Sequence, residues 1–257
     1  MTSQTVILMF SIFFGFILGS FLNVCIYRIP IKKSIIKPPS SCPLCGTGIN
    51  FYDNIPVVSW LVLRGRCRNC YGHISVRYPA VEAIAGIISL ALFLRYGLTL
   101  SYFLDLTFML ALIVVSFIDF DHMVIPDVIS IPGIIVGVIA SFLLPDLKWT
   151  ASLIGIVAGG GILFITAFMF EKITGKEGMG GGDIKLLAMI GAWLGWKLLP
   201  VIILIAALTA SICGGLLMLL SKKDSQTRIP FGPFLSYAAI ACFFFGNDIM
   251  AWYIQKF

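Results

Sequence analysis

Apolar residues in this chain gather in long blocks that short polar segments separate. A helix needs about 20 mostly apolar residues to cross about 30 Å of hydrocarbon, at a rise of about 1.5 Å per residue. The sixth block is short and runs into Pro200, so the sixth and seventh helices also fit one broken helix. The pattern predicts eight membrane-spanning helices, over residues 5–27, 81–98, 101–118, 128–146, 150–171, 184–198, 199–221 and 232–254.

The composition agrees with this pattern. The chain has 257 residues, of which 59% are hydrophobic and 12% are charged, whereas soluble domains average about 45–50% apolar and about 25% charged residues. An ordinary soluble enzyme is therefore excluded. A disordered chain is excluded too, because disorder requires low hydrophobicity and high charge. The predicted fold class is an all-α polytopic membrane protein.

The positive charges predict the orientation of the helices. The first apolar block has no basic residue before it and is followed by Arg28, Lys32 and Lys33, which is typical of an anchor whose N-terminus lies outside. The outer face then carries Arg95, Lys148, Lys197 and Lys256, and the inner face carries the other basic residues of the 18. Topology and anionic lipid explain the net charge of +6. Scattered basic residues do not indicate a nucleic-acid surface.

The one long polar segment lies between the first two predicted helices. Residues 28–80 are rich in proline and too few to bury a large hydrophobic core, so this segment needs a cross-link to stabilise its fold. We expect three parts: a first transmembrane helix over residues 1–27, a small cytoplasmic module over residues 28–80, and a transmembrane domain over residues 81–257.

Four of the seven cysteines form two CxxC pairs in this segment. Two such pairs supply four thiolates to one tetrahedral Zn²⁺ at about 2.3 Å, and four cysteines leave no open position for catalysis. Glycines follow at Gly46 and Gly72, where the chain is expected to turn tightly around the metal. The alternatives are two disulfides, which a cytoplasmic location disfavours, and a redox dithiol, which needs only one pair. The ligands of this structural zinc would be Cys42, Cys45, Cys67 and Cys70.

Two carboxylates lie where apolar blocks meet the inner loops. Asp119 follows the third block and Asp183 precedes the sixth, after Gly180 and Gly182. Carboxylates at a membrane boundary are costly and often functional. When two such groups meet, one keeps a proton while the other activates water, as in aspartic peptide hydrolysis. An ion- or proton-coupling site in a small transporter is an equal alternative, and Asp119 and Asp127 also fit helix caps.

Several motifs occur in order from residue 19 to the last apolar block. They are Gly19-Ser20-Phe21-Leu22-Asn23-Val24 with Arg28 and Pro30, the two CxxC pairs, Arg77-Tyr78-Pro79 with Glu82, Asp119 followed after five residues by Ile125-Pro126-Asp127, Gly175-Lys176-Glu177-Gly178-Met179-Gly180 with Gly182-Asp183, and Pro230-Phe231-Gly232-Pro233. Each motif is weak by itself. The ordered set resembles the bifunctional type IV prepilin peptidases, which are membrane aspartic proteases of the GxGD class.

The resemblance implies an enzyme of the bacterial inner membrane that cleaves at the cytoplasmic face. Such an enzyme removes the basic leader of type IV prepilins or type II secretion pseudopilins and then methylates the new N-terminus from S-adenosylmethionine. By motif, Asp119 and Asp183 are the catalytic pair, Gly180 and Gly182 belong to the supporting loop, and the four cysteines match the zinc tetrad. The implied partners are pilin-like substrate helices and membrane lipid. A peptidase without methylation is the alternative, which the intact cysteines disfavour.

Overall fold

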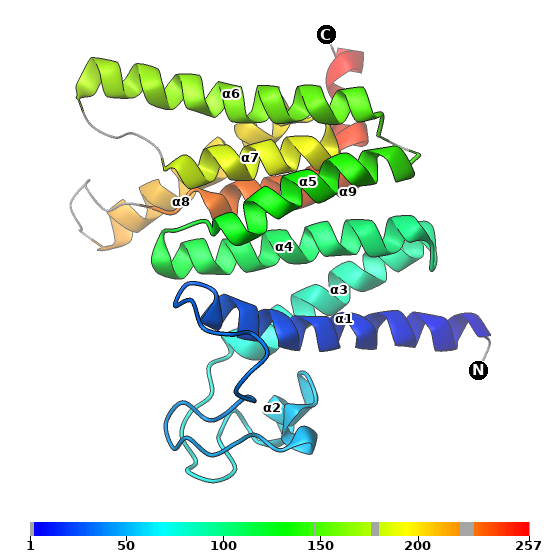
Figure 1. The fold of residues 1–257 in the computed structure, drawn as a ribbon, viewed down its shortest axis with the longest axis vertical. Helices are drawn as coiled ribbons and strands as arrows, with labels where there is room; N and C mark the ends of the chain where they lie inside the picture. The colour runs from blue at the N-terminus through cyan, green and yellow to red at the C-terminus, as the bar shows by residue number, and fades with distance from the viewer. Residues whose placement is uncertain (1–2, 146, 176–179, 222–228, 257) are drawn as a thin grey trace. The chain divides into compact units, whose positions relative to one another are not determined.

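The structure is a computed structural model that describes residues 3–145, 147–175, 180–221 and 229–256. The eight predicted helices are all present (Figure 1), and two short helical segments, η1 and α2, lie in the polar segment between α1 and α3. The elements are α1 (Ser3–Arg28), η1 (Phe51–Asn54), α2 (Val58–Val62), α3 (Arg77–Tyr96), α4 (Leu100–His122), α5 (Asp127–Leu143), α6 (Trp149–Thr174), α7 (Gly181–Leu194), α8 (Leu199–Ser221) and α9 (Gly232–Lys256).

Five of these helices are long and apolar enough to cross a membrane, namely α1, α3, α4, α6 and α8. The sixth and seventh predicted helices are separate. Gly195 ends α7 with a φ of +74°, a backbone conformation that residues other than glycine rarely adopt. As a result α7 ends four residues before the predicted limit. Its 14 residues measure about 21 Å, which is shorter than the hydrocarbon core.

The chain divides into two compact units, at residues 1–114 and 115–257. In unit 1, α1 packs along α3 at two glycines of α1. A Cβ on Gly15 would lie 2.6 Å from the Cβ of Ser89, and a Cβ on Gly19 would lie 2.6 Å from the Cα of Glu82. Ser89 donates a hydrogen bond of 2.7 Å to the carbonyl of Ser11 on α1. Small residues at a four-residue spacing thus bring the two backbones together, as in other membrane helix pairs.

Unit 2 is built around α7, which lies beside α5 and α6 (Figure 1). Every residue from Leu186 to Trp193 is buried, so α7 has no lipid-facing side over these two turns. Gly155 of α6 and Gly191 of α7 touch backbone to backbone, since a Cβ on either glycine would overlap the carbonyl of the other. Trp193 fixes α5 by donating a hydrogen bond of 2.8 Å to the carbonyl of Gly133. This burial explains why a helix shorter than the bilayer is so apolar.

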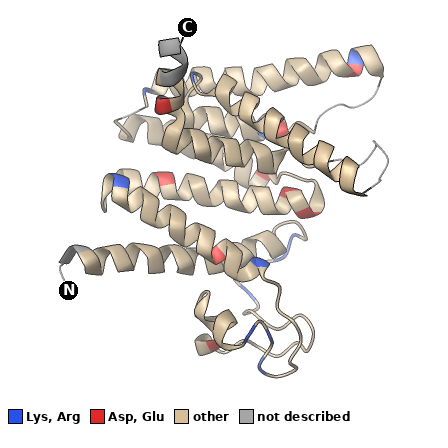
Figure 2. Cartoon of the chain, turned by 180° about the vertical axis from the view of Figure 1, so that it is seen from behind, with Lys and Arg blue, Asp and Glu red and all other residues tan. Residues whose placement is uncertain are grey.

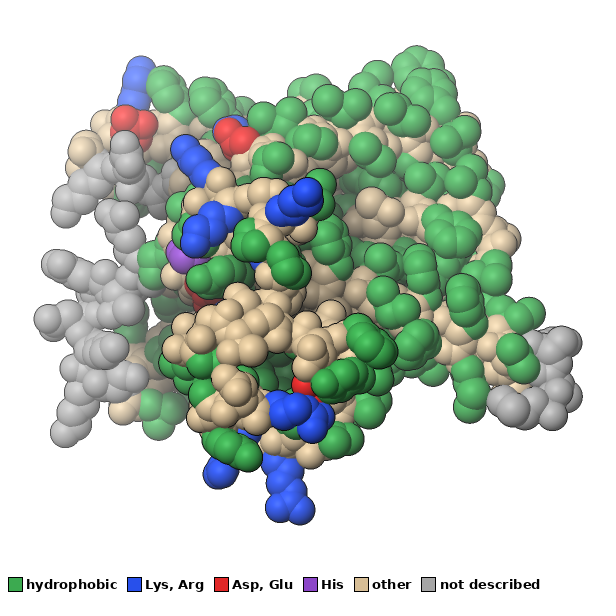
Figure 3. Space-filling view, turned by 60° about the horizontal axis from the view of Figure 1, so that its bottom comes forward, with side chains coloured by type: hydrophobic (Ala, Val, Ile, Leu, Met, Phe, Trp, Pro, Cys, Tyr) green, Lys and Arg blue, Asp and Glu red, His purple; other side chains and the backbone are tan. Residues whose placement is uncertain are grey.

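The outer surfaces of the helices are apolar. Charged residues are sparse along the helices (Figure 2), and hydrophobic side chains cover much of the exposed helix surface in the space-filling view (Figure 3). On α6, for example, Val157 is 74% exposed and Ile165 is 62% exposed. In water such a surface would be an aggregation liability, whereas lipid tails solvate it. The structure therefore supports the expected fold class of an all-helical membrane protein with a small cysteine-bearing module between α1 and α3.

The contact between Gly155 and Gly191 predicts how the α6–α7 pair responds to substitution. Gly155→Val should destabilise the protein by about 1–3 kcal/mol or more, because the new side chain meets backbone that cannot move aside. We expect the unfolding temperature in detergent to fall by about 4 °C or more. Gly161→Val on the same helix is the matched control, because no atom lies within 4 Å of its Cβ position. Equal effects of the two substitutions would contradict the proposed packing.

Candidate zinc centre and carboxylate pair

The four predicted zinc ligands lie together in unit 1. The Sγ atoms of Cys42, Cys45, Cys67 and Cys70 are all within 4.8 Å of one another, and those of Cys42 and Cys70 are 3.8 Å apart. Four thiolates bound tetrahedrally at about 2.3 Å from Zn²⁺ would be separated by about 3.8 Å. The described cysteines are all free of disulfides. The arrangement therefore fits one tetrahedral metal ion.

The two CxxC pairs have the same local backbone. The N–H of Cys42 bonds to the carbonyl of Thr47, and the N–H of Cys67 bonds to the carbonyl of Gly72. The tight turn falls on Gly46, with a φ of +70°, in the first pair, but on Tyr71, with a φ of +56°, in the second. The expectation that Gly72 makes the second turn is therefore wrong. A Cβ on Gly72 would overlap the end of the Leu44 side chain, so a larger residue there requires Leu44 to move aside.

Hydrogen bonds within the cysteine cluster favour deprotonation of two of its thiols, those of Cys45 and Cys67. Hydrogen bonds from Thr47 lower the pKa of the Cys45 thiol to about 6, and backbone N–H groups of Cys70 and Asn69 lower the pKa of Cys67. At Cys70 the N–H of Gly72 lowers the pKa, but burial and the neighbouring thiols outweigh it and raise the value to about 11. The clustered thiols thus differ in how readily they lose their protons. Four neighbouring thiolates would repel one another, and a divalent cation that binds all four removes this repulsion.

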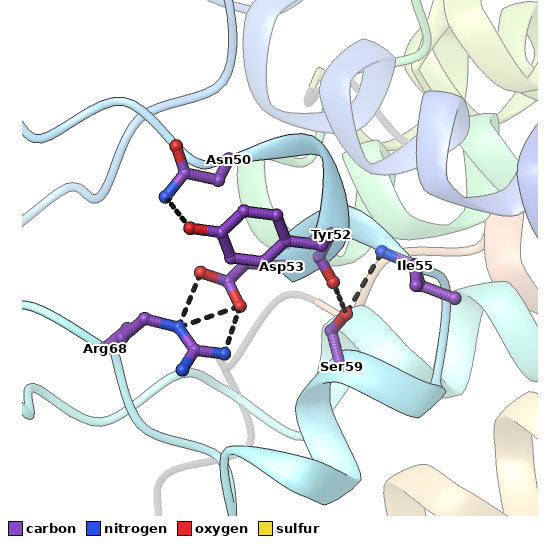
Figure 4. A network of polar contacts seen from close by, with 6 residues as sticks. All are labelled: Asn50, Tyr52, Asp53, Ile55, Ser59 and Arg68. Carbon is purple, nitrogen blue, oxygen red and sulfur yellow. Dashed lines mark hydrogen bonds and ion pairs between the residues drawn. The ribbon is translucent and has the colours of Figure 1, made fainter.

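An ion pair joins the second CxxC pair to η1 (Figure 4). Arg68, which lies between Cys67 and Cys70, donates from Nε and Nη2 to the Asp53 carboxylate at 2.6–3.0 Å. The Arg68 guanidinium also lies over the Tyr52 ring, 5.6 Å from its centroid. A two-pronged contact of this kind fixes orientation as well as distance. The pair therefore holds the second CxxC turn against η1 in the absence of a large hydrophobic core.

The module is joined to the helices of unit 1 through three motif residues. Asn23 of α1 donates a hydrogen bond of 3.1 Å to the carbonyl of Tyr78 at the start of α3. Arg28 donates to the carbonyls of Ser34 and Pro38, which folds the loop that leaves α1. Glu82 of α3 accepts a hydrogen bond of 2.6 Å from the N–H of Val57. Motif residues that sequence reasoning left without a role thus attach the module to its two helices.

The first of the two carboxylates, Asp119, lies near the end of α4 and is 5% exposed. Its Oδ2 accepts a hydrogen bond of 2.9 Å from the backbone N–H of Gly232, at the start of α9. A Cβ on Gly232 would lie 2.7 Å from that same oxygen, so only glycine permits this approach. The capping alternative for Asp119 is wrong, because the residue lies inside a helix and before its C-terminal end.

The second carboxylate, Asp183, lies in the first turn of α7 and outside the five candidate spans. Its Oδ1 is buried and has no hydrogen-bond partner. Burial, and secondarily the negative charge of Asp119, raise the pKa of Asp183 to about 7. The structure therefore brings the two acids close enough to oppose each other's ionisation, as expected for a carboxylate pair.

Ile125 joins the two halves of this site. A Cβ on Gly182 would lie 2.8 Å from the Ile125 Cβ, and a Cβ on Gly232 would lie 3.1 Å from the Ile125 Cδ1. Gly182 precedes Asp183, and Gly232 binds Asp119, so one side chain packs beside both acids. The two glycines of this loop differ in how closely they are packed: a Cβ on Gly182 would be too near Ile125, whereas a Cβ on Gly180 would meet Asp183 Oδ2 only at 3.5 Å, an ordinary contact distance. The motif residues 176–179 lie outside the described residues.

Asp127 does not cap α5 as expected. Pro126 occupies the N-cap position, and no side chain caps this helix. Asp127 instead forms an ion pair with Lys185 of α7, with Nζ 2.7 Å from Oδ1. Both side chains are exposed, so the pair contributes at most about 1 kcal/mol. It joins the first turns of α5 and α7 beside the carboxylate pair.

Comparison with known proteins agrees with both parts of the chain. Residues 13–96 match the bacterial peptidase A24 N-terminal domain, and residues 106–215 match the type IV leader peptidase family. The chain belongs to the type IV leader peptidase family. A relative from Aeromonas hydrophila, named prepilin leader peptidase/N-methyltransferase, is 37% identical over 95% of this chain and 92% of its own length. Relatives with the same name from Pseudomonas aeruginosa and Legionella pneumophila are 36% and 34% identical over 95% and 94% of the chain, and over 92% of their own lengths. No solved structure matches the chain.

Some residues of this family member could not be singled out from the sequence alone. Gly232 belongs to a motif, but its contact with Asp119 spans more than a hundred residues along the chain. Arg68 and Asp53 lie in a loop where charged residues are common, and nothing in their spacing marks a pair. The only available signal was the position of Asp53 as the sole acidic residue among residues 28–80.

The cysteine geometry predicts the metal content of this family member. Purified protein should contain about one zinc ion per chain, and Cys42→Ser or Cys67→Ser should remove most of it, because three thiolates bind Zn²⁺ more weakly than four. Cys213→Ser, which replaces an exposed cysteine of α8, is the control and should keep the metal. Elemental analysis by mass spectrometry gives the ratio. Wild-type protein without zinc would contradict the assignment.

Proposed function

We propose that this chain removes the basic leader peptide from type IV prepilins or type II secretion pseudopilins and then methylates the new N-terminal residue. The names of its relatives supply both activities. The observation that carries the peptidase assignment is the pair of buried Asp119 and half-buried Asp183, whose Oδ1 is buried; each acid lies at the end of an apolar helix. A transporter would use such a pair to move ions, but membership of a peptidase family favours hydrolysis.

The environments of the two acids assign their roles in cleavage. Both acids lose solvent by burial, but only Asp119 has a backbone N–H, that of Gly232, donating to its Oδ2, so Asp119 ionises more readily than Asp183 and acts as the base. Asp183 has an unpartnered buried oxygen and a raised pKa, so it carries the proton and acts as the acid. Asp119 takes a proton from the attacking water while Asp183 protonates the carbonyl oxygen of the scissile bond. No covalent intermediate with the protein forms.

We place the site at the cytoplasmic face of the bacterial inner membrane, with the N-terminus outside. The distribution of Lys and Arg supports this topology. The apolar substrate helix would lie in the lipid while its basic leader stays in the cytoplasm. The scissile bond must be extended there, because a helical peptide bond is shielded by its own turn. Substrate helices and lipid are thus the partners of this protein.

In this proposal the chain has three functional parts. Residues 1–27 form an anchor, residues 28–80 form the zinc module, and residues 81–257 carry the peptidase. Cys42, Cys45, Cys67 and Cys70 would hold one structural Zn²⁺, which supplies cross-linking of the two CxxC turns and no open coordination site. S-adenosylmethionine is the methyl donor and is consumed as a second substrate. The zinc module orders the loops of unit 1 that serve methylation.

Incubating purified enzyme with a prepilin and S-adenosylmethionine tests both activities at once. We expect a product that lacks the leader and has gained one methyl group, as measured by mass spectrometry. Asp119→Asn and Asp183→Asn should each lower cleavage by about 10³-fold or more, because neither variant can share a proton across the attacking water.

Asp121→Asn is the matched control for the two active-site substitutions, because Asp121 is exposed and lies two residues from Asp119. It should keep cleavage within about threefold, a range typical of a surface substitution. Appreciable cleavage by either active-site variant, in protein that is folded and inserted, would exclude the proposed carboxylate pair.

The raised pKa of Asp183 predicts the alkaline limb of cleavage. Asp183 must be protonated to act as the acid, so kcat/KM should fall as the pH rises through about 7. This apparent pKa belongs to the coupled pair rather than to one residue. Initial rates between pH 5 and 9 with a short prepilin substrate give the profile. Constant kcat/KM up to pH 9 would argue against Asp183 as the acid.

A further inference from the structure

The proposed methylation requires a group that accepts a proton from an amine. An α-amino group has a pKa near 8 and is largely an ammonium at neutral pH, in which form nitrogen has no lone pair to offer. A site that methylates it therefore needs a carboxylate or another base beside the nitrogen. Nothing in the carboxylate pair of unit 2 supplies this, because both acids are engaged in hydrolysis.

The carboxylates of unit 1 leave one candidate. They belong to Asp53, Glu82 and Asp105. Asp53 is neutralised by the bidentate contact with Arg68. Asp105 lies in the first two turns of α4, which in the proposed topology is the outer end of that span. Glu82 lies in the second turn of α3, at the cytoplasmic end, next to the zinc module.

Glu82 is buried, with 8% of its surface exposed. Its Oε2 accepts the Val57 N–H at 2.6 Å. Among the described residues, none forms an ion pair with it. A carboxylate offers about four acceptor positions, of which this hydrogen bond occupies one. Glu82 is thus a buried carboxyl group with acceptor capacity left and no ion-pair partner among the described residues.

The surroundings of Glu82 are held in place at a conformational cost. Val57, which donates to Glu82, has a φ of +62°, and a β-branched residue rarely adopts such a backbone. On the other side, α1 approaches so closely that a Cβ on Gly19 would lie 2.6 Å from the Cα of Glu82. Backbone strain of this kind is retained where the surrounding structure requires it, often at functional sites. The α1–α3 contact and the module together fix the position of this carboxylate.

We propose that Glu82 binds the new N-terminal amine of the cleaved substrate and accepts its proton, and that the methylation site lies where α1, α3 and the Val57 loop meet. This inference rests on the proposed function. The ammonium N–H bond breaks and the proton passes to a free carboxylate oxygen of Glu82. The nitrogen lone pair then bonds to the methyl carbon of the sulfonium donor, and the C–S electron pair stays on sulfur. Glu82 releases its proton to water before the next turnover.

A purely structural role for Glu82 predicts a different result for one substitution. Glu82→Gln keeps an oxygen that accepts the Val57 N–H but removes the charge and the basicity. If Glu82 only supports Val57, this variant should methylate normally. If Glu82 binds the amine, methylation should fall by about 10²-fold or more, while leader cleavage and zinc content stay within about twofold of wild type. Glu171→Gln, the same substitution at an exposed position of α6, is the matched control and should leave methylation unchanged.

A second measurement uses wild-type protein and does not depend on how the variant folds. A synthetic peptide with the sequence of a cleaved pilin N-terminus is added without methyl donor, at a low concentration that favours bound over dissolved amine. A carbodiimide then joins the peptide amine to a neighbouring carboxylate as an amide, without adding atoms. We expect an amide between the peptide nitrogen and Glu82, identified by peptide mass spectrometry. An N-acetylated peptide is the control and should give no such product.

The outcomes separate this inference from the proposed function. Wild-type methylation by Glu82→Gln, absence of the cross-link, or a cross-link to another carboxylate would each overturn the inference and leave the proposed function intact. A wild-type enzyme that cleaves but never methylates would instead overturn the methylation half of the proposed function. If Glu82→Gln loses zinc and cleavage as well, the variant is misfolded, and the cross-link on wild-type protein then decides whether Glu82 binds the amine.

Discussion

A carboxylate among apolar helices is stable only where the backbone comes near enough to solvate it or where it keeps its proton, and unit 2 meets this constraint with glycine. Gly232 lets a backbone N–H reach Asp119. Gly182 lets the first turn of α7 pack beside Ile125, which places Asp183 in the same region. Further along α7, Gly191 meets Gly155 of α6, so the whole helix is held from several sides. The position of the two acids therefore depends on close backbone packing.

The pattern of the sequence was sufficient to predict where the helices lie and which side chains cluster. Apolar blocks located all eight helices, although only five of these are long and apolar enough to cross a membrane. The CxxC spacing was sufficient to bring Cys42, Cys45, Cys67 and Cys70 together, since each pair is local and the metal geometry restricts the rest. The two acids stood out because carboxylates are rare in this chain.

Contacts between distant segments could not be predicted in the same way. The length of α7 depends on Gly195, and nothing in the apolar run itself marks its last residue. The second turn of the cysteine module falls on Tyr71 rather than on Gly72, although glycine is the residue that favours a positive φ. Asp127 fits a cap by its sequence position, yet Lys185 of α7 binds it. In each case tertiary contacts outweighed local preference.

Ile125 has a consequence for how substrates act on the enzyme. Because its side chain packs beside Gly182 and Gly232 together, a displacement of the segment before α5 would move the surroundings of both acids at once. Under the proposed function, a substrate helix in contact with α5 would then change the spacing of the two acids without touching either one.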